Sequence, residues 1–332
     1  MTIRSISEFE KLNRIEEGTF GIVYRAKELK TGEIVAIKKL KLENEREGFP
    51  VTSLREINAL MSLRHPHVVG LREMVVGPEL DSVFLVMDFI EHDLKSLLES
   101  LKEPLALSEV KTILHQLLEG LAFMHDKWII HRDLKTSNIL FTNNGMVKIA
   151  DFGLARKFSD DWENNKFTPV VVTLWYRAPE LLFGEANYLE SIDVWSLGCI
   201  FGELMLLAPL FPGQNEIDQL DKIARTMGPY PANIYGTLPH FSKFKKQPSH
   251  QDRIDLIFSK LPSSGRDLLR KMLMYDPATR ISAKEALQHE FFTQDPLPKD
   301  PKNFPSWPSM NERDRSHTHK STPPAPKRPV EE

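Results

Sequence analysis

The hydrophobic pattern of the chain changes near Asp88, and this change constrains the fold more than any other feature of the sequence. Between Phe9 and Asp88, apolar and polar residues alternate over short stretches that are separated by turn signals such as residues 30–33, KTGE. Such alternation is typical of half-buried strands and predicts an antiparallel sheet. Beyond Asp88, apolar residues recur at helical spacing in long stretches that Ser or Asp often opens. This second part is therefore predicted to be mostly helical.

One helix is expected within the strand-rich part. Residues 50–63 offer Pro50 and a capping Thr52 or Ser53 near their start, and apolar residues then follow at helical spacing. We therefore expect an α+β fold of two lobes, with an antiparallel β N-lobe over about residues 9–88 and a mostly helical C-lobe over about residues 91–292. A cleft between two such lobes is a common place for a ligand pocket.

Composition argues against several classes of protein. The 332 residues carry a net charge of −3 with both signs interspersed, which does not suit a bulk nucleic-acid binder with a strongly basic face. The chain contains no uninterrupted run of 18 or more apolar residues, so no membrane-spanning helix is predicted. The one cysteine, Cys199, lies in an apolar run and is expected to be a buried thiol. We expect a soluble protein of a reducing compartment that contacts neither nucleic acid nor membranes directly.

The C-terminal part differs from both lobes. From about Pro296 onward, proline, lysine and acidic residues replace the helical periods. We expect residues 293–310 to form a C-terminal extension of the domain. Residues 311–332 contain too few apolar side chains to fold alone and are predicted to be disordered.

Two glycines in a predicted turn indicate a close approach of the backbone to a ligand. Residues 16–23, EEGTFGIV, place Gly18 and Gly21 between two predicted strands. A hairpin turn alone would also explain them, because glycine is common in turns.

The strand that follows ends in a lysine. Residues 35–38 read VAIK, and the ammonium of Lys38 could hold phosphate groups, with a surface lysine as the alternative. Glu56, on the predicted helix, could pair with Lys38 and hold it in place.

Residues 131–138, HRDLKTSN, form the most specific pattern of the chain and are followed by DFG at 151–153. One carboxylate must orient an attacking hydroxyl and accept its proton, while another carboxylate and an amide oxygen hold magnesium. Asp133, Asp151 and Asn138 are the right residue types in the right order. Lys135 could neutralise charge on a transferring phosphoryl group.

Together with Ala178-Pro179-Glu180, these motifs resemble those of the eukaryotic protein kinases over residues 9–292. The resemblance implies the protein kinase-like bilobal fold, with ATP and Mg²⁺ as cofactors. It assigns Asp133, Lys135, Lys38 and Glu56 to catalysis, and Asn138 and Asp151 to the metal. The implied ATP-binding residues are Ile15, Glu16, Glu17, Gly18, Thr19, Phe20, Gly21, Ile22, Val23, Ala36, Lys38, Met87, Asp88, Phe89, Ile90 and Asp93.

The resemblance also implies finer roles. The backbone of Asp88 and Ile90 would face the adenine edge, with Met87 behind it. Glu180 and Arg280 would form a structural ion pair, and Asp193 would anchor the catalytic loop, residues 131–138.

Two residues of the glycine-rich turn depart from the family pattern. Glu16 stands where the family usually has its first glycine, which would make the nucleotide site slightly more acidic. Phe20 has no hydroxyl, so tyrosine phosphorylation of this turn, an inhibitory signal in many members of the family, is not expected.

Residues 50–56, PVTSLRE, resemble the signature of the cyclin-dependent kinases and differ by one conservative change from the name of the PITSLRE subgroup. This implies a Ser/Thr kinase for Ser-Pro or Thr-Pro sites, with an L-type cyclin as partner, or an M-type cyclin if the chain is the related short kinase. Membership of this subgroup implies a role in transcription or pre-mRNA splicing. The protein is therefore expected in the nucleus, with the cytoplasm as a second location. The alternatives are a kinase-fold scaffold that binds cyclin and a small-molecule phosphotransferase.

The same resemblance implies a regulatory phosphate on Thr168. Arg55, Arg132 and Arg156 match the family's phosphate-binding cluster. One phosphate would then connect the helix at residues 50–63, the catalytic loop and the activation segment, which lies between Asp151 and Glu180.

Overall fold

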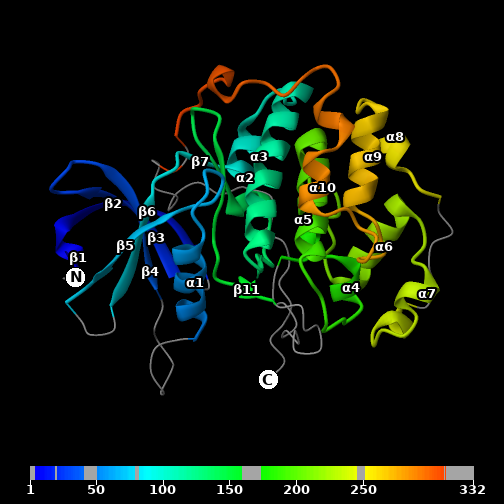
Figure 1. The fold of residues 1–332 in the computed structure, drawn as a ribbon, viewed down its shortest axis with the longest axis horizontal. Coiled ribbons are helices and arrows are strands. Elements are labelled where there is room, and N and C mark those ends of the chain that lie inside the picture. The colour runs from blue at the N-terminus through cyan, green and yellow to red at the C-terminus, as the bar shows by residue number, and fades with distance from the viewer. Residues whose placement is uncertain are drawn as a thin grey trace.

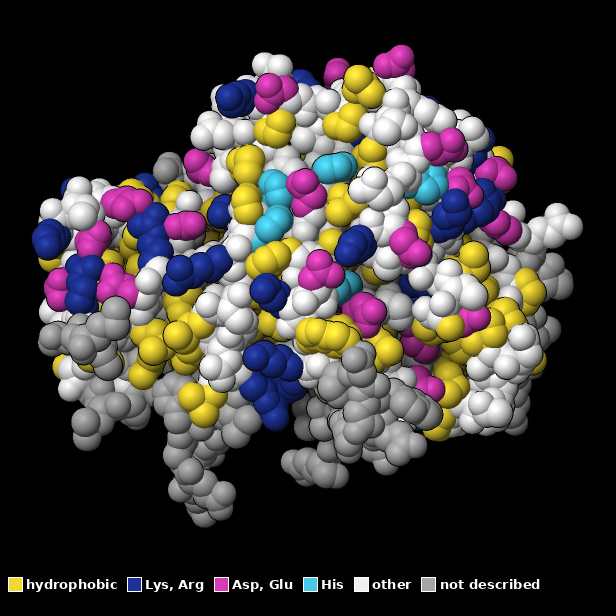
Figure 2. All heavy atoms as spheres, viewed as in Figure 1, with side chains coloured by type: hydrophobic (Ala, Val, Ile, Leu, Met, Phe, Trp, Pro, Cys, Tyr) yellow, Lys and Arg dark blue, Asp and Glu magenta, His cyan; other side chains and the backbone are white. Residues whose placement is uncertain are grey.

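The computed structural model describes residues 4–18, 21–40, 51–78, 82–158, 173–244, 251–309 and 311. They form a strand-rich lobe and a helical lobe (Figure 1), which confirms the predicted α+β fold of two lobes. None of the helices in these ranges is long and apolar enough to cross a membrane. Figure 2 shows basic and acidic side chains interspersed over the same face of the molecule.

The N-lobe is built on one six-stranded sheet with the order β1-β5-β6-β4-β3-β2. Neighbouring strands are antiparallel, except that the short β1 runs parallel to β5. The strands are β1 (Arg4–Ser5), β2 (Phe9–Gly18), β3 (Gly21–Glu28), β4 (Ile34–Leu40), β5 (Leu71–Val76) and β6 (Val83–Asp88). Strand β1 was not predicted, because two residues are too few to show a periodicity.

Helix α1 (Val51–Ser62) agrees with the helix predicted over residues 50–63. Its inner face buries Ile57 and Leu60 in the core that continues into the C-lobe. The strands enclose a smaller core of their own around Phe9, Ile37 and Phe84. Helix α1 therefore packs against the junction of the lobes as well as against its own sheet.

The C-lobe is mostly helical. Its helices are α2 (Leu94–Ser100), α3 (Leu107–Asp126), α4 (Pro179–Leu182), α5 (Ser191–Leu206), α6 (Glu216–Met227), α7 (Ala232–Tyr235), α8 (Ile254–Ile257), α9 (Ser263–Met272) and α10 (Ala283–Leu287). Short strands complete it: β7 (His92–Asp93), β9 (Ile139–Phe141) and β10 (Val147–Ile149) form one sheet, and β8 (Ile129–Ile130) pairs with β11 (Arg156–Lys157). Residues 131–138 thus connect two short strands, β8 and β9.

Helix α5 lies in the core of the C-lobe. Most of its residues are buried, among them Cys199, as the sequence predicts. Two polar side chains of α5, Asp193 and Glu203, are buried as well. Because a helix enclosed on most sides holds its side chains firmly, these two can fix the segments that they contact.

Residues beyond α10 cross the C-lobe and return to the junction of the lobes, coloured orange to red in Figure 1. Asn311, predicted to begin a disordered tail, is 2% exposed and donates a hydrogen bond to the Ile90 carbonyl. The prediction is wrong at this residue, because the composition of a segment does not reveal the distant partners of one polar side chain. Residues 312–332 lie outside the described part of the chain.

Candidate active site

Lys38 lies at the centre of a buried ion-pair cluster that joins the two lobes. Its ammonium, at the end of a side chain on β4, contacts Glu56 of α1 (Nζ–Oε1 2.6 Å) and Asp151 of the C-lobe (Nζ–Oδ1 2.9 Å). Burial lowers the pKa of Lys38, but the charges of Asp151 and Glu56 outweigh burial and raise it. Burial raises the pKa of Glu56, and the neighbouring ammonium opposes this rise. The cluster therefore holds a protonated lysine at a fixed place beside Asp151.

The segment between β8 and β9 brings Asp133, Lys135 and Asn138 together. Lys135 Nζ lies 2.8 Å from Asp133 Oδ2, and Asn138 Nδ2 donates to the Asp133 carbonyl (2.8 Å) and to Asp133 Oδ2 (3.1 Å). Burial raises the pKa of Asp133 although the charge of Lys135 opposes it. A buried carboxylate with a raised pKa accepts a proton more readily than an exposed one.

Asp193 of α5 fixes the backbone at the start of the segment between β8 and β9. Its carboxylate accepts hydrogen bonds from the backbone N–H groups of His131 (2.7 Å) and Arg132 (2.9 Å). Arg132 has a φ of 72°, in the left-handed region that non-glycine residues rarely adopt. The two hydrogen bonds stabilise this unusual backbone, and the structure thus places Asp193 as the predicted anchor of the loop.

Asn138 and Asp151 can together offer oxygen ligands to a metal. Asn138 uses its amide nitrogen for Asp133, which leaves its oxygen to accept or coordinate. Burial raises the pKa of Asp151, but Lys38 more than offsets this, so its pKa is lowered and the carboxylate is ionised. Among the described residues, no group of three or more His, Cys, Asp or Glu side chains could hold a metal ion. The donor set fits a magnesium ion that takes its other ligands from phosphates and water.

The two glycines of the predicted glycine-rich turn lie at the ends of β2 and β3. Gly18 and Gly21 face each other at the tip of the β2–β3 hairpin, whereas Thr19 and Phe20 lie outside the described residues. A Cβ atom at Gly21 would collide with the Lys39 carbonyl oxygen, so glycine is required there by the close approach of β4.

The sheet arranges the other predicted nucleotide-binding residues. Val23 pairs with Lys38 across β3 and β4, and Ala36 pairs with Met87 across β4 and β6. The Asp88 side chain is bound to Arg72 (Oδ1–Nε 2.7 Å). Its backbone groups therefore remain the part of Asp88 that could contact adenine.

Two of the predicted nucleotide-binding residues have other partners. The Ile90 carbonyl accepts a hydrogen bond from Asn311 (2.9 Å), so the backbone N–H of Ile90 is the group that could contact adenine. Asp93 caps helix α2 by accepting from Ser96 N (2.8 Å). Both residues remain predictions as nucleotide contacts. The sequence could not reveal either partner, because contacts of single polar groups leave no periodic signal.

A family model described as the protein kinase domain matches residues 9–292. The chain belongs to the protein kinase family. It is 50% identical to human cyclin-dependent kinase 11B over 316 residues, which are 94% of this chain and 40% of that protein. The rat protein of the same name is 50% identical over 314 residues, 93% of this chain and 72% of that protein. The fruit-fly (Drosophila melanogaster) serine/threonine-protein kinase PITSLRE is 49% identical over an alignment of 336 positions that covers 97% of this chain and 35% of that protein.

These relatives confirm the predicted resemblance to the PITSLRE subgroup of the cyclin-dependent kinases. The chain spans less than half the length of the human and fruit-fly proteins. The kinase family uses ATP with a divalent metal ion, which agrees with the ligands that Asn138 and Asp151 offer.

The three arginines of the predicted phosphate site lie close enough to repel one another. Burial and the positive charges of Arg132 and Arg55 lower the pKa of Arg156 to about 10. The Arg132 guanidinium also lies over the Tyr188 ring, 5.7 Å from its centroid. Such a concentration of positive charge would be relieved by an anion. Thr168 lies outside the described residues.

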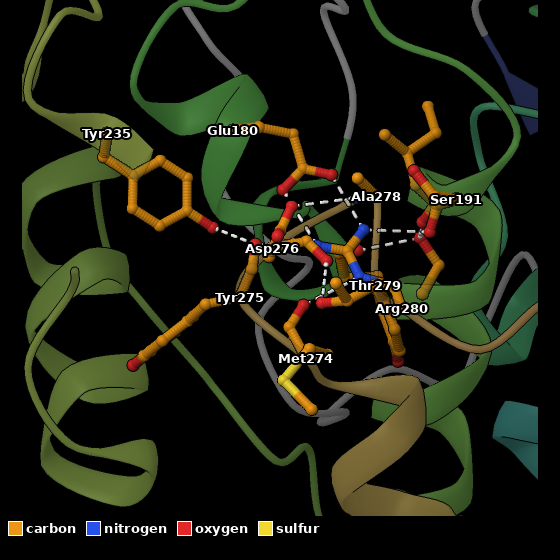
Figure 3. A network of polar contacts seen from close by, with 12 residues as sticks. Glu180, Ser191, Tyr235, Met274, Tyr275, Asp276, Ala278, Thr279 and Arg280 are labelled. Carbon is orange, nitrogen blue, oxygen red and sulfur yellow. Dashed lines mark hydrogen bonds and ion pairs between the residues drawn. The ribbon is translucent and has the colours of Figure 1, made fainter. Parts of the chain in front are cut away.

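The predicted ion pair of the kinase C-lobe is fully formed. Figure 3 shows Arg280 Nη1 and Nη2 against the two carboxylate oxygens of Glu180 (2.7 and 3.1 Å), with further hydrogen bonds to the carbonyls of Met274 and Ser191. Both side chains are buried. A cavity of about 560 Å³ beside them is lined by Glu180, Tyr235 and Arg280 among others. It lies within the C-lobe and is separate from Asp133.

Glu203 is a site residue that sequence reasoning missed. Its carboxylate accepts hydrogen bonds from the hydroxyls of Tyr176 (Oε2–Oη 2.6 Å) and Thr136 (Oε1–Oγ1 3.1 Å). It therefore connects the catalytic loop to the end of the activation segment. A glutamate within the apolar run SLGCIFGELMLL was the available signal, since a buried carboxylate needs partners.

Proposed function

We propose that the chain is an ATP-dependent protein Ser/Thr kinase that transfers the γ-phosphoryl group of ATP to protein hydroxyls. The observation that carries this proposal is the meeting of Lys38 and Asp151 across the lobes, next to the loop that holds Asp133. Each charged group that phosphoryl transfer needs is thereby held in place before substrate arrives.

The residues supply the following chemistry. Asp133 orients the acceptor hydroxyl and takes its proton as the oxygen forms a bond to the γ-phosphorus and the bond to the ADP oxygen breaks. Lys135, 2.8 Å from Asp133, neutralises charge on the transferring group. Lys38 holds the phosphates that remain on ADP. A Mg²⁺ ion held by Asn138 and Asp151 would supply further charge neutralisation at the phosphates.

We further propose that the kinase requires a cyclin, which binds the outer face of α1. Leu54 is 46% exposed and Met61 is 61% exposed on this helix, whereas Glu56 on its inner side is 3% exposed. A partner that covers the outer face would hold Glu56 against Lys38 and so favour the active arrangement. The name of the human relative supports a cyclin partner, and the choice of an L-type or M-type cyclin rests on the resemblance to the PITSLRE subgroup alone.

Phosphorylation of Thr168 is proposed to complete activation. A phosphate there would add nearly two negative charges beside the mutually repelling Arg55, Arg132 and Arg156. We expect Thr168→Ala to lower the cyclin-bound rate severalfold or more, as measured by initial rates at saturating ATP. A rate equal to that of the wild type would contradict this proposal.

We also propose that the kinase phosphorylates Ser-Pro and Thr-Pro sites, that it acts in transcription or splicing, and that it is located in the nucleus or also in the cytoplasm. These proposals rest on the resemblance to the PITSLRE subgroup alone.

The deciding experiment is phosphorylation of a Ser-Pro peptide library by the chain co-expressed with cyclin L, with cyclin M or with no cyclin. Asp133→Asn serves as the blank. Activity with cyclin L alone that is lost in the blank would support the PITSLRE assignment, and activity with cyclin M alone would favour the short sister kinase. A chain that binds cyclin but transfers no phosphate with any cyclin would instead be a scaffold.

A further inference from the structure

The C-terminal extension is fixed to the C-lobe before it reaches the junction of the lobes. Its first attachment is at Lys299, whose backbone N–H donates to the Ser108 carbonyl (3.0 Å) and whose ammonium lies 2.8 Å from Glu109 on α3. Further along, Phe304 is 7% exposed and packs on Phe141 with ring centroids 5.6 Å apart. These contacts leave the segment little freedom to move relative to the C-lobe.

Trp307 continues this attachment at the edge of the small β7–β9–β10 sheet. Its backbone N–H donates to Asn143 Oδ1 (2.9 Å), and its ring lies 5.7 Å from that of Phe141. The same Asn143 oxygen contacts His92 Nε2 (3.0 Å). His92 lies just after residues 87–90, the predicted hinge between the lobes. The extension is thus held by α3 and then by the residues next to the hinge.

Asn311 ends this path with three hydrogen bonds that join both lobes. Its side-chain Nδ2 donates to the Ile90 carbonyl (2.9 Å), and its backbone N–H donates to the Glu91 carbonyl (3.0 Å). Its own carbonyl accepts from Asn13 Nδ2 on β2 (3.0 Å). Since Asn311 is 2% exposed, its bond to Ile90 is buried and that from Asn13 is partly buried, so each is costly to lose.

Asn13 reaches Asn311 from an irregular position of the N-lobe sheet. The register of β2 against β3 shifts between Lys11 and Asn13, which marks a β-bulge. A bulge re-aims the side chains next to it. Asn13 also lies two residues before Ile15, and Ile90 is a hinge residue, so Asn311 connects the two segments that are predicted to flank adenine.

We propose that residues 299–309 and 311 form a strap that fastens the C-lobe to the hinge and to β2, and that Asn311 is thereby a positioning residue for ATP. The strap limits the movement of β2 relative to the hinge, so the nucleotide meets a preformed adenine site rather than one that must close on binding. The inference rests on the proposed ATP-dependent activity.

The test measures binding of a fluorescent ADP derivative with Mg²⁺ to the full chain and to four variants: Asn311→Ala, Asn13→Ala, the double variant, and Asn303→Ala. Asn303 is an exposed asparagine of the same strap and serves as the matched control. We expect Kd to rise about three- to tenfold in each of the first two variants, the range that corresponds to one buried hydrogen bond. Asn303→Ala should bind like the wild type.

The double variant distinguishes positioning from two independent losses. Asn13 can bind the Asn311 carbonyl only while the Asn311 side chain keeps the strap in place, so the double variant should be no weaker than the weaker single variant. With the active cyclin complex, KM for ATP should rise by the same factor, while kcat and KM for peptide stay unchanged. Hydrogen exchange at the amides of residues 88–92 should quicken in Asn311→Ala without nucleotide.

Other results would overturn the inference in separate ways. Wild-type affinity in both Asn311→Ala and Asn13→Ala, with unchanged exchange at the hinge, would show that the strap does not position the nucleotide site. If Asn311→Ala lowers the thermal midpoint of the whole chain, the comparison of Asn13→Ala with the wild type decides the inference, because Asn13 is only half-buried. A wild-type chain that binds no ADP even in complex with its cyclin would instead overturn the proposed function, and the inference with it.

Discussion

Glu16 is the residue at which the nucleotide site departs most clearly from the kinase pattern. Burial, and next the charge of Asp151, raise the pKa of its carboxyl group, while Lys135 opposes the rise. As a whole, however, the residue remains exposed to solvent. This carboxylate therefore lies within electrostatic reach of the groups that would hold the phosphates.

We expect Glu16→Gly to lower KM for ATP about two- to fivefold, because one negative charge no longer repels the phosphates. Steady-state kinetics with the cyclin complex measure this. Glu10→Gly is the matched control, since Glu10 is an exposed glutamate of the same strand, β2. A KM that is unchanged or higher in Glu16→Gly would indicate that the carboxylate assists nucleotide binding instead.

Glu203 makes the stability of the fold depend on pH. Burial raises its pKa above the ordinary 4.5, although its hydrogen bonds from Tyr176 and Thr136 oppose the rise. A carboxyl group with a higher pKa in the folded chain stabilises the fold below its unfolded pKa. This contribution is lost as pH rises through the folded pKa.

Glu203→Gln cannot ionise, so its free energy of unfolding should fall less than that of the wild type between about pH 5 and pH 8. Urea unfolding at the two pH values measures the difference. Glu290→Gln, at an exposed position of the C-lobe, should keep the wild-type pH dependence. Parallel curves for the wild type and Glu203→Gln would contradict the assignment.

At the scale of elements, α1 has one face that the fold uses and one that it leaves to solvent. Ile57 and Leu60 are buried, whereas Leu54 is 46% exposed. Because α1 also carries Glu56, any partner on its outer face would act directly on the Lys38 contact.

We expect Leu54→Asp to weaken cyclin binding at least tenfold, since a charge would be buried in an apolar interface. Pull-down titration or calorimetry with the cyclin measures this. Leu256→Asp is the control, as Leu256 is 68% exposed on α8 in the C-lobe. Equal losses in both variants would point to a general effect on solubility rather than to an α1 interface.

At the scale of the whole molecule, the Glu180–Arg280 pair ties the end of the activation segment to the core of the C-lobe. Arg280→Met would leave the Glu180 carboxylate buried without its partner, so the free energy of unfolding should fall by about 3–5 kcal/mol. Chemical denaturation measures this loss. Arg270→Met breaks an ion pair with Asp255, which is 67% exposed, and should cost about 1 kcal/mol or less. Similar values for the two variants would contradict the burial argument.

The sequence alone determined the two-lobed fold, the helix at residues 50–63 and the residues of the catalytic loop. These features depend on local information. Periodicity reports which face of an element is buried, and the HRDLKTSN and DFG segments keep their chemistry within a few residues of one another. The contact of Lys38 with Glu56, 18 residues apart, was also predictable, because both residues belong to recognisable motifs.

Only the tertiary structure decided which distant polar groups meet. Asn311 binds Ile90 across 221 residues of sequence, and Glu203 binds Thr136 across 67. A single asparagine in a proline-rich segment and a single glutamate in an apolar run carry no period and no motif. Their partners are set by how whole elements pack, since each buried polar group must be satisfied by whatever the fold brings within about 3 Å.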